Sequence, residues 1–260
     1  MNVSTSKLLT AAAAAATVSA GASAQNVIDF NGIPTLDTVT TQIPGLTVSA
    51  SSPFADSPEE VFAWDFNGFP EFDFAGQQAP FTSGNATGRE LGQGLALRGP
   101  EGVLTGFGVL PEPIPTPLEK RRPAGTINLA FDNPLDSFGF TIVDVEGPEE
   151  FETNTGFFLD FLSNGQDVAT FDFADFVTEG SDVFDSSIVF GDRSANQIQP
   201  ITAAQLGVAS FDEVRISLGG SAVIAQVTAN PAVVPTPSAA LAGLALLGAG
   251  ALRRRTRDAA

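Results

Sequence analysis

The sequence predicts an all-β protein, an antiparallel β-sandwich of jelly-roll type, over residues 25–232. Three observations indicate this fold. Apolar residues in the middle of the chain recur with a period of two rather than 3.6, in short segments bounded by Gly, Pro, Asn or Asp. The 22 Phe residues suit a core between two sheets, because Phe has no polar atom that needs a partner. The remaining length, roughly 210 residues, suits one such domain.

The strands are expected in chain order wherever apolar and polar residues alternate. They are predicted around residues 27–30, 46–48, 127–131, 138–142, 157–162, 168–173, 214–218 and 223–227. The dipeptide Asn164-Gly165 accepts positive φ at both positions and predicts a type I′ hairpin between two of them. One short helix is predicted at residues 202–206, after Pro200.

Two regions interrupt this alternation. Residues 51–94 are rich in Phe, Gly, Pro and acidic residues and are expected to be irregular. The tetrapeptide Asp-Phe-Asn-Gly occurs at residues 29–32 and again at 65–68, which we interpret as two tight turns, with a duplicated unit as the alternative. Residues 111–125 hold five prolines, which predict an exposed loop of polyproline II character.

Both ends of the chain carry targeting patterns. Lys7 precedes an apolar stretch, and Ala22 and Ala24 supply the small side chains that signal peptidase needs, so residues 1–24 are predicted to be a signal helix removed before Gln25. Residues 233–260 contain a second apolar run, at 238–252. It is shorter than the roughly 20 residues of a full membrane span, so a short transmembrane helix is expected there.

The tail has three parts in a fixed order: Pro235-Thr236-Pro237, the apolar run, and Arg253, Arg254 and Arg255. With the signal peptide, this order resembles the PEP-CTERM class of exported proteins, although the signature tripeptide there is Pro-Glu-Pro. The resemblance implies processing by an exosortase-type membrane protease after transient anchoring in the inner membrane. It also implies a final location at the cell surface or outside the cell. A plain C-terminal anchor is the alternative.

The order of the central segments is also similar to the jelly-roll domains found ahead of this sorting signal. The stretches that carry this resemblance are residues 27–30 and 45–48, 138–140 and 144–146, and 211–214 and 218–221. The resemblance implies the fold only.

Composition excludes several classes of function. Without Lys7, the four tail arginines and Asp258, seven basic and 29 acidic residues remain, a net charge of −22. Such a surface repels nucleic acid and anionic lipid. The chain has no Cys and therefore no disulfide, and it has no His or Tyr. A Ser-His-Asp triad, a Cys nucleophile and a histidine zinc site are thus excluded, and we expect no enzyme.

Three groups of residues are candidates for ligand contacts. Asp144 and Glu146, with Asp29, are candidates for calcium, because carboxylates at the end of an apolar strand face need a cation or solvent. Trp64 is the only tryptophan, and it is either a sugar-stacking platform or a core residue. The third group is the basic run Lys120, Arg121 and Arg122. It is either a docking site for a polyanion or part of a solvated loop.

The sequence as a whole predicts an exported, non-catalytic protein with a structural or adhesive role in an exopolysaccharide-rich envelope or biofilm. The expected partners are signal peptidase, an exosortase-type protease and extracellular polysaccharide, with no nucleic acid. The first alternative is a calcium-dependent carbohydrate-binding module. The second is a carboxylate glycosidase, which needs only two Asp or Glu residues.

Overall fold

A computed structural model describes residues 26–53, 59–67, 79–98, 123–145, 156–220 and 222–232. The predicted signal helix and the predicted C-terminal helix lie outside these residues, as does most of the proline-rich segment. Within the described part every regular element is a strand except one four-residue 3-10 helix, η1 (Phe173–Phe176). The prediction of an all-β protein is therefore confirmed. No described segment forms a helix long and apolar enough to cross a membrane.

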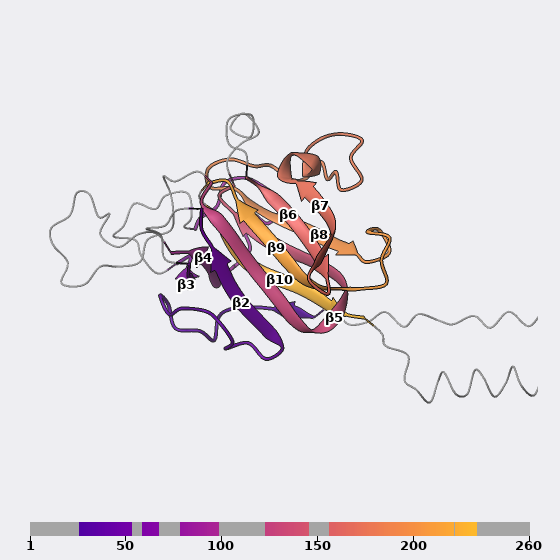
Figure 1. Ribbon diagram of the computed structural model, residues 1–260. Helices are drawn as coiled ribbons and strands as arrows, with labels where there is room; N and C mark the ends of the chain where they lie inside the picture. Colours follow the sequence, from indigo (N-terminus) through magenta and orange to yellow (C-terminus); the bar gives the residue numbers. More distant parts are fainter. Residues whose placement is uncertain are drawn as a thin grey trace, which may run out of the picture.

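Ten strands in the described residues form one antiparallel sheet (Figure 1). They are β1 (Val27–Ile28), β2 (Leu46–Ser51), β3 (Val61–Asp65), β4 (Gln93–Leu97), β5 (Gly125–Val143), β6 (Phe158–Ser163), β7 (Gln166–Asp172), β8 (Ala195–Thr202), β9 (Phe211–Leu218) and β10 (Val223–Pro231).

Strand β5 is 19 residues long and turns back on itself in the middle. The ring centroids of Phe131 and Phe138 lie 6.1 Å apart. Seven residues of straight strand would instead separate two positions by about 23 Å. The turn is formed by the exposed residues 132–134, Asp-Asn-Pro. The two strands that the sequence predicts at 127–131 and 138–142 are therefore the two halves of one strand.

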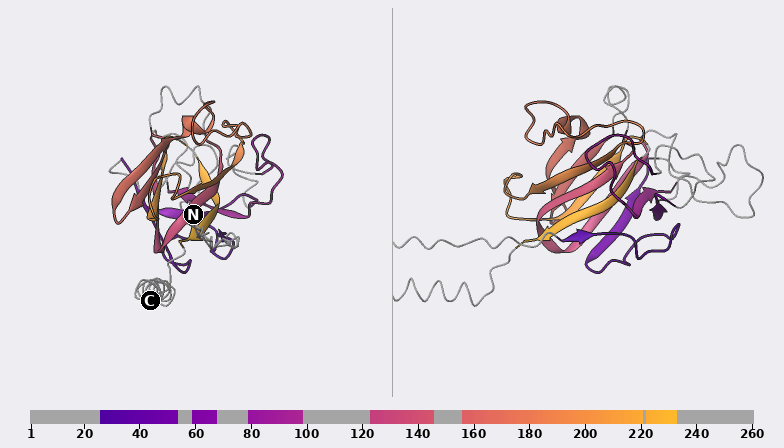
Figure 2. Two further views of the ribbon diagram at one scale, coloured as in Figure 1. Left: turned by 90° about the vertical axis from the view of Figure 1, so that its right-hand side faces the viewer. Right: turned by 180° about the vertical axis from the view of Figure 1, so that it is seen from behind.

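The two halves of β5 lie in two layers. The first half pairs with β2 on one side and β9 on the other, and the layer continues through β6 to β7. We call this layer, β2-β5-β9-β6-β7, the front layer (Figure 1). The second half pairs with β8 and β10, and β10 pairs in turn with β1 and β4. This back layer, completed by β3, is seen from behind in Figure 2.

The main core fills the space between the layers. Phe138 of the back layer meets Phe161 of the front layer at 6.3 Å between ring centroids. Phe161 also contacts Phe211 at 5.0 Å, edge to face. All three rings are fully buried. Much of the Phe content of the chain thus packs between the layers, as the sequence predicts.

A second apolar cluster, the outer cluster, covers the other face of the back layer. It contains Phe62 and Trp64 from β3, together with Phe81 and Leu91 from the covering segment 79–92. Strand β3 is consequently buried on both faces, since Val61 and Ala63 point into the main core. The expectation that residues 51–94 are irregular is wrong, because they contain β3 and the start of β4. A strand buried on both faces shows no apolar–polar alternation for a sequence pattern to detect.

The structure differs from the sequence-based expectation at three other places. Strand β8 was not predicted, because it contains Pro200 and carries polar residues beside its apolar ones. Residues 202–206 form no helix but part of a short turn, which Thr202 and Gln205 close by mutual hydrogen bonds and which ends near Gly207, where φ is +73°. Phe173, expected at the end of a strand, begins η1, whose N-cap is Asp172.

The turn predictions agree with the structure. Asn164 and Gly165 have φ of +52° and +74°, as a type I′ hairpin requires. In each Asp-Phe-Asn-Gly tetrapeptide the Asp side chain accepts a hydrogen bond from the Asn backbone N–H, at 3.2 Å for Asp29 and 2.8 Å for Asp65. Both tetrapeptides are therefore Asx-type turns, as interpreted from the sequence.

Phe161 is the best position to test the packing between the layers. Replacing Phe161 by Ala should lower the free energy of unfolding by about 3–5 kcal/mol, because it empties a site surrounded by other Phe rings. Chemical denaturation followed by circular dichroism measures the change. Phe184→Ala is the control, since that side chain is 38% exposed and should cost only about 0.5 kcal/mol. Equal losses in the two variants would contradict the packing described.

Candidate functional site

The front layer carries a groove on its outward face. Its volume is about 580 Å³. Four neighbouring strands, β2, β5, β9 and β6, contribute its lining. The lining residues are almost all polar: Ser49, Ser51, Thr126, Asn128, Ala130, Asp160, Glu213, Arg215 and Ser217.

Strand register places five polar side chains in one line across the front layer. Ser49 of β2 is opposite Asn128 of β5, and Asn128 is opposite Arg215 of β9. Arg215 is in turn opposite Asp160 of β6, and Asp160 is opposite Thr170 of β7. Directly opposed side chains are about 5 Å apart at Cβ and can interact. We call this line of five residues the polar row.

The residues of the polar row face outward because their chain neighbours face the core. Ile127 and Leu129 flank Asn128, and both are fully buried in the main core. Val214 and Ile216 flank Arg215 in the same way. Successive side chains of a strand point to opposite faces, so burial of one set exposes the other.

Arg215 is the only positively charged side chain among the described residues that line the groove. Its Nε lies 2.7 Å from Oε1 of Glu213, and its Nη1 lies 3.8 Å from Oδ1 of Asp167. The Arg215 side chain is 39% exposed, so these ion pairs add little to stability. They hold the guanidinium over the sheet and balance its charge. Asp160 leaves the groove with a net negative charge.

The other polar side chains of the groove form hydrogen bonds with one another, and they can still form further hydrogen bonds with a ligand. The Thr170 hydroxyl donates to Oδ1 of Asp160 at 2.6 Å. The hydroxyls of Thr126 and Ser217 lie 2.9 Å apart. A carboxylate can accept about four hydrogen bonds, and a hydroxyl both donates and accepts. The groove therefore presents oriented donors and acceptors to solvent.

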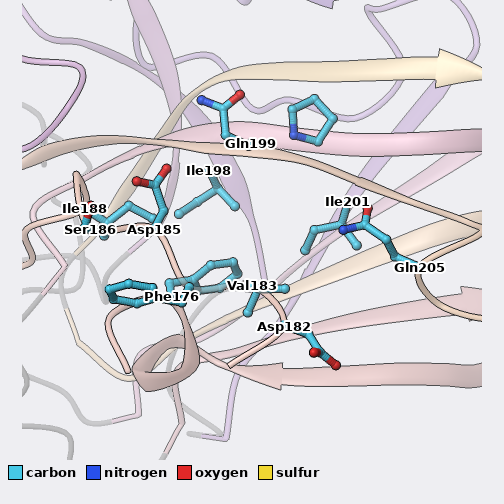
Figure 3. Close-up of a pocket in the computed structure, with 12 residues that line it drawn as sticks. Phe176, Asp182, Val183, Asp185, Ser186, Ile188, Ile198, Gln199, Ile201 and Gln205 are labelled. Carbon is cyan, nitrogen blue, oxygen red and sulfur yellow. The ribbon is translucent and has the colours of Figure 1, made fainter. Parts of the chain in front are cut away.

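A second hollow, of about 360 Å³, lies between η1, residues 182–188 and β8 (Figure 3). Its walls include the apolar residues Phe176, Ile188 and Ile198. Asp185 accepts hydrogen bonds from the backbone N–H and the hydroxyl of Ser187, at 2.8 and 2.5 Å. Gln205 is engaged with Thr202 in the turn that follows β8. These polar groups of the hollow thus bond within their own loops, whereas those of the polar row are aligned across neighbouring strands.

Trp64 lies in the outer cluster and is 0% exposed. Its ring packs edge to face against Phe62 at 6.2 Å between centroids. A sugar-stacking platform needs an exposed ring face, which Trp64 does not offer in this structure. Of the two interpretations made from the sequence, its burial supports the core residue.

The calcium candidates are not assembled in the described part of the chain. Asp144, at the end of β5, has φ of +61° and accepts a hydrogen bond from the Arg193 backbone N–H at 3.1 Å. Asp29 follows β1, and β10 lies between β1 and β5. Glu146 lies outside the described residues. Within those residues no three His, Cys, Asp or Glu side chains are grouped to hold a metal ion.

The remaining candidate residues also lie outside the described ranges. These are the basic residues Lys120, Arg121 and Arg122 and the processing residues Ala22, Ala24, Gln25, Pro235, Thr236, Pro237, Arg253, Arg254 and Arg255. Their expected roles stay predictions.

The groove was not predicted from the sequence. Alternation does place Thr126, Asn128, Arg215 and Ser217 on the polar side of their strands. It does not say which strands are neighbours, so it could not bring β2, β5, β9 and β6 together. Comparison with known proteins adds nothing to this site: no family model matches the chain, and no curated protein matches its sequence.

The burial of Trp64 gives a spectroscopic prediction. Its emission should be blue-shifted and protected from iodide quenching in the folded protein, and it should become quenchable on denaturation. Because the ring lies in the outer cluster and the groove is on the front layer, adding polysaccharide should leave the emission unchanged. A polysaccharide-dependent change in emission or quenching would instead favour the platform interpretation.

Proposed function

We propose that this protein is an exported, non-catalytic component of the cell surface or extracellular matrix, with a structural or adhesive role in an exopolysaccharide-rich envelope. The observation that carries the proposal is the groove of the front layer. Hydroxyl, amide, guanidinium and carboxylate side chains are aligned there on a solvent-facing sheet. These are the groups that bind the hydroxyls of a polysaccharide.

The chemistry of the groove supports binding more than catalysis. Asp160 accepts a hydrogen bond from Thr170, and Glu213 forms an ion pair with Arg215. Both carboxylates thus serve as acceptors within the sheet surface. The groove has serine and threonine hydroxyls, but the chain has no His to activate them, and carboxylates are the only proton-transfer groups in the described lining.

Within this proposal the fold is a jelly-roll-type β-sandwich. Two features support it: β5 contributes to both layers, and the consecutive strands β9 and β10 belong to different layers. The export route in the proposal follows from the signal pattern and from the resemblance of the tail to PEP-CTERM sorting signals. The chain would be anchored briefly in the inner membrane and then released to the surface by an exosortase-type protease.

A polysaccharide pull-down tests the adhesive role. The double variant Asn128→Ala, Arg215→Ala should lose at least about fivefold in bound protein, because it removes two donors at the centre of the polar row. Arg89→Ala is the matched control, since Arg89 is exposed on the segment that covers the back layer. If the groove variant and the control bind the same amount of polysaccharide as the parent protein, the groove is not the adhesive surface.

Cell fractionation tests the sorting role of the tail. Replacing Pro235 and Pro237 by Ala should leave the protein unprocessed in the inner membrane, because the tripeptide is the part of the signal that the protease is expected to read. Immunoblots of membrane and released fractions measure the effect. A variant that is retained and processed like the parent protein would show that the sorting hypothesis is wrong.

A further inference from the structure

We infer that the groove takes a chain of uncharged sugars, laid along the polar row across the strands, and that it discriminates against acidic polysaccharides. This inference rests on the proposed function, because it names the class of polysaccharide that the same groove binds. Three observations carry it: the direction of the polar row, the charges beside it, and the balance of donors and acceptors.

The direction of the polar row determines the shape of the ligand. The row runs from Ser49 on β2 to Thr170 on β7 and crosses five strands. Four gaps of about 4.8 Å give a line of about 19 Å. A line of this length accommodates several sugar units of a linear chain. Figure 1 shows the strands of the front layer side by side.

The charges beside the row disfavour an acidic ligand. Glu213 lies 2.7 Å from the Arg215 guanidinium and balances the one positive charge of the groove. Asp160 lies in the row itself, and Asp167 lies at its edge, 3.8 Å from Arg215. A uronate, sulfate or phosphate group would approach uncompensated carboxylates of like charge. No other described arginine lines the groove to offset them.

The polar groups of the row match hydroxyls, which both donate and accept. Asn128 and Arg215 supply N–H donors, and Asp160 supplies acceptor oxygens, on three adjacent strands. An uncharged sugar chain can satisfy both kinds of group together. A purely accepting anionic group would satisfy the donors and leave Asp160 without a partner from the ligand.

One aromatic ring borders the polar row. Phe158 of β6 is opposite Ser217 of β9 and is half-buried, and its alternation with the buried Leu159 places it on the outward face. The described residues that line the groove include no aromatic side chain. Hydrogen bonds along the row must therefore supply most of the affinity, so affinity should rise with the number of sugar units that the row contacts.

Affinity electrophoresis of the purified full chain tests the inference. The probes are neutral glucans, mannans and galactans, each paired with its carboxymethylated derivative on the same backbone. At least one neutral polymer should retard the protein, and its carboxymethylated partner should retard it at least about fivefold less. Asn128→Ala should weaken the retardation by the neutral polymer, and Arg89→Ala should not.

The isosteric double variant Asp160→Asn, Glu213→Gln separates charge from shape. It removes the two carboxylates that line the groove and keeps the side-chain size. Binding of the carboxymethylated polymer should therefore increase toward that of the neutral one. Thermal melts of every variant confirm that it is folded before retardation is compared. A double variant that still rejects the carboxymethylated polymer as strongly as the parent does would overturn the inference.

Two results distinguish the inference from the proposed function. If the carboxymethylated polymer binds better than the neutral one and Arg215→Ala removes that binding, the inferred selectivity is wrong while the adhesive role of the groove stands. If no polymer binds, or binding is unaffected by every groove variant, the proposed function fails together with the inference.

Discussion

The turn in β5 at residues 132–134 determines how both layers are built. It puts one strand into both layers, so each layer is built on a half of β5. The apolar side changes parity just after the turn: Ile127, Leu129 and Leu135 face the main core, and Phe138 and Phe140 face it from there on. The pairing of β5 with β10 shifts register at this point, between Leu135 and Ser137. Without that shift, one half of β5 would present its apolar side to solvent.

The polar row depends on the same alternation as the core. Its five residues come from parts of the chain as far apart as Ser49 and Arg215, and strand pairing alone aligns them. A slip of one residue in β9 would replace Arg215 in the row by Val214 or Ile216 and would move an arginine into the main core. Burying an unpaired charge is so unfavourable that the core fixes the register of the groove. The groove is thus specified by the same residues that form the core.

The sequence predicted those parts of the fold that local chemistry determines. Period-two alternation located most strands of the front layer, and Asn164-Gly165 located its hairpin, because a one-face-buried strand and a positive-φ turn leave direct marks in the sequence. Strand β3 left no such mark, since Phe62 and Trp64 face one apolar cluster while Val61 and Ala63 face another. The groove could not be predicted for a different reason. It is a property of strand order, and strand order is decided by contacts between residues distant in the chain.

In the proposed adhesive role, the acidic composition and the groove are complementary. A chain with 30 acidic and 12 basic residues repels copies of itself and acidic polymers. Long-range attraction therefore would not supply the proposed adhesion, which would need a specific surface that acts at short range. In the groove Arg215 is balanced by Glu213, and the remaining side chains are mostly hydroxyl and amide groups, so hydrogen bonding can outweigh the general repulsion there. The same repulsion keeps polyanions away from a sheet whose polar face would otherwise bind them without selectivity.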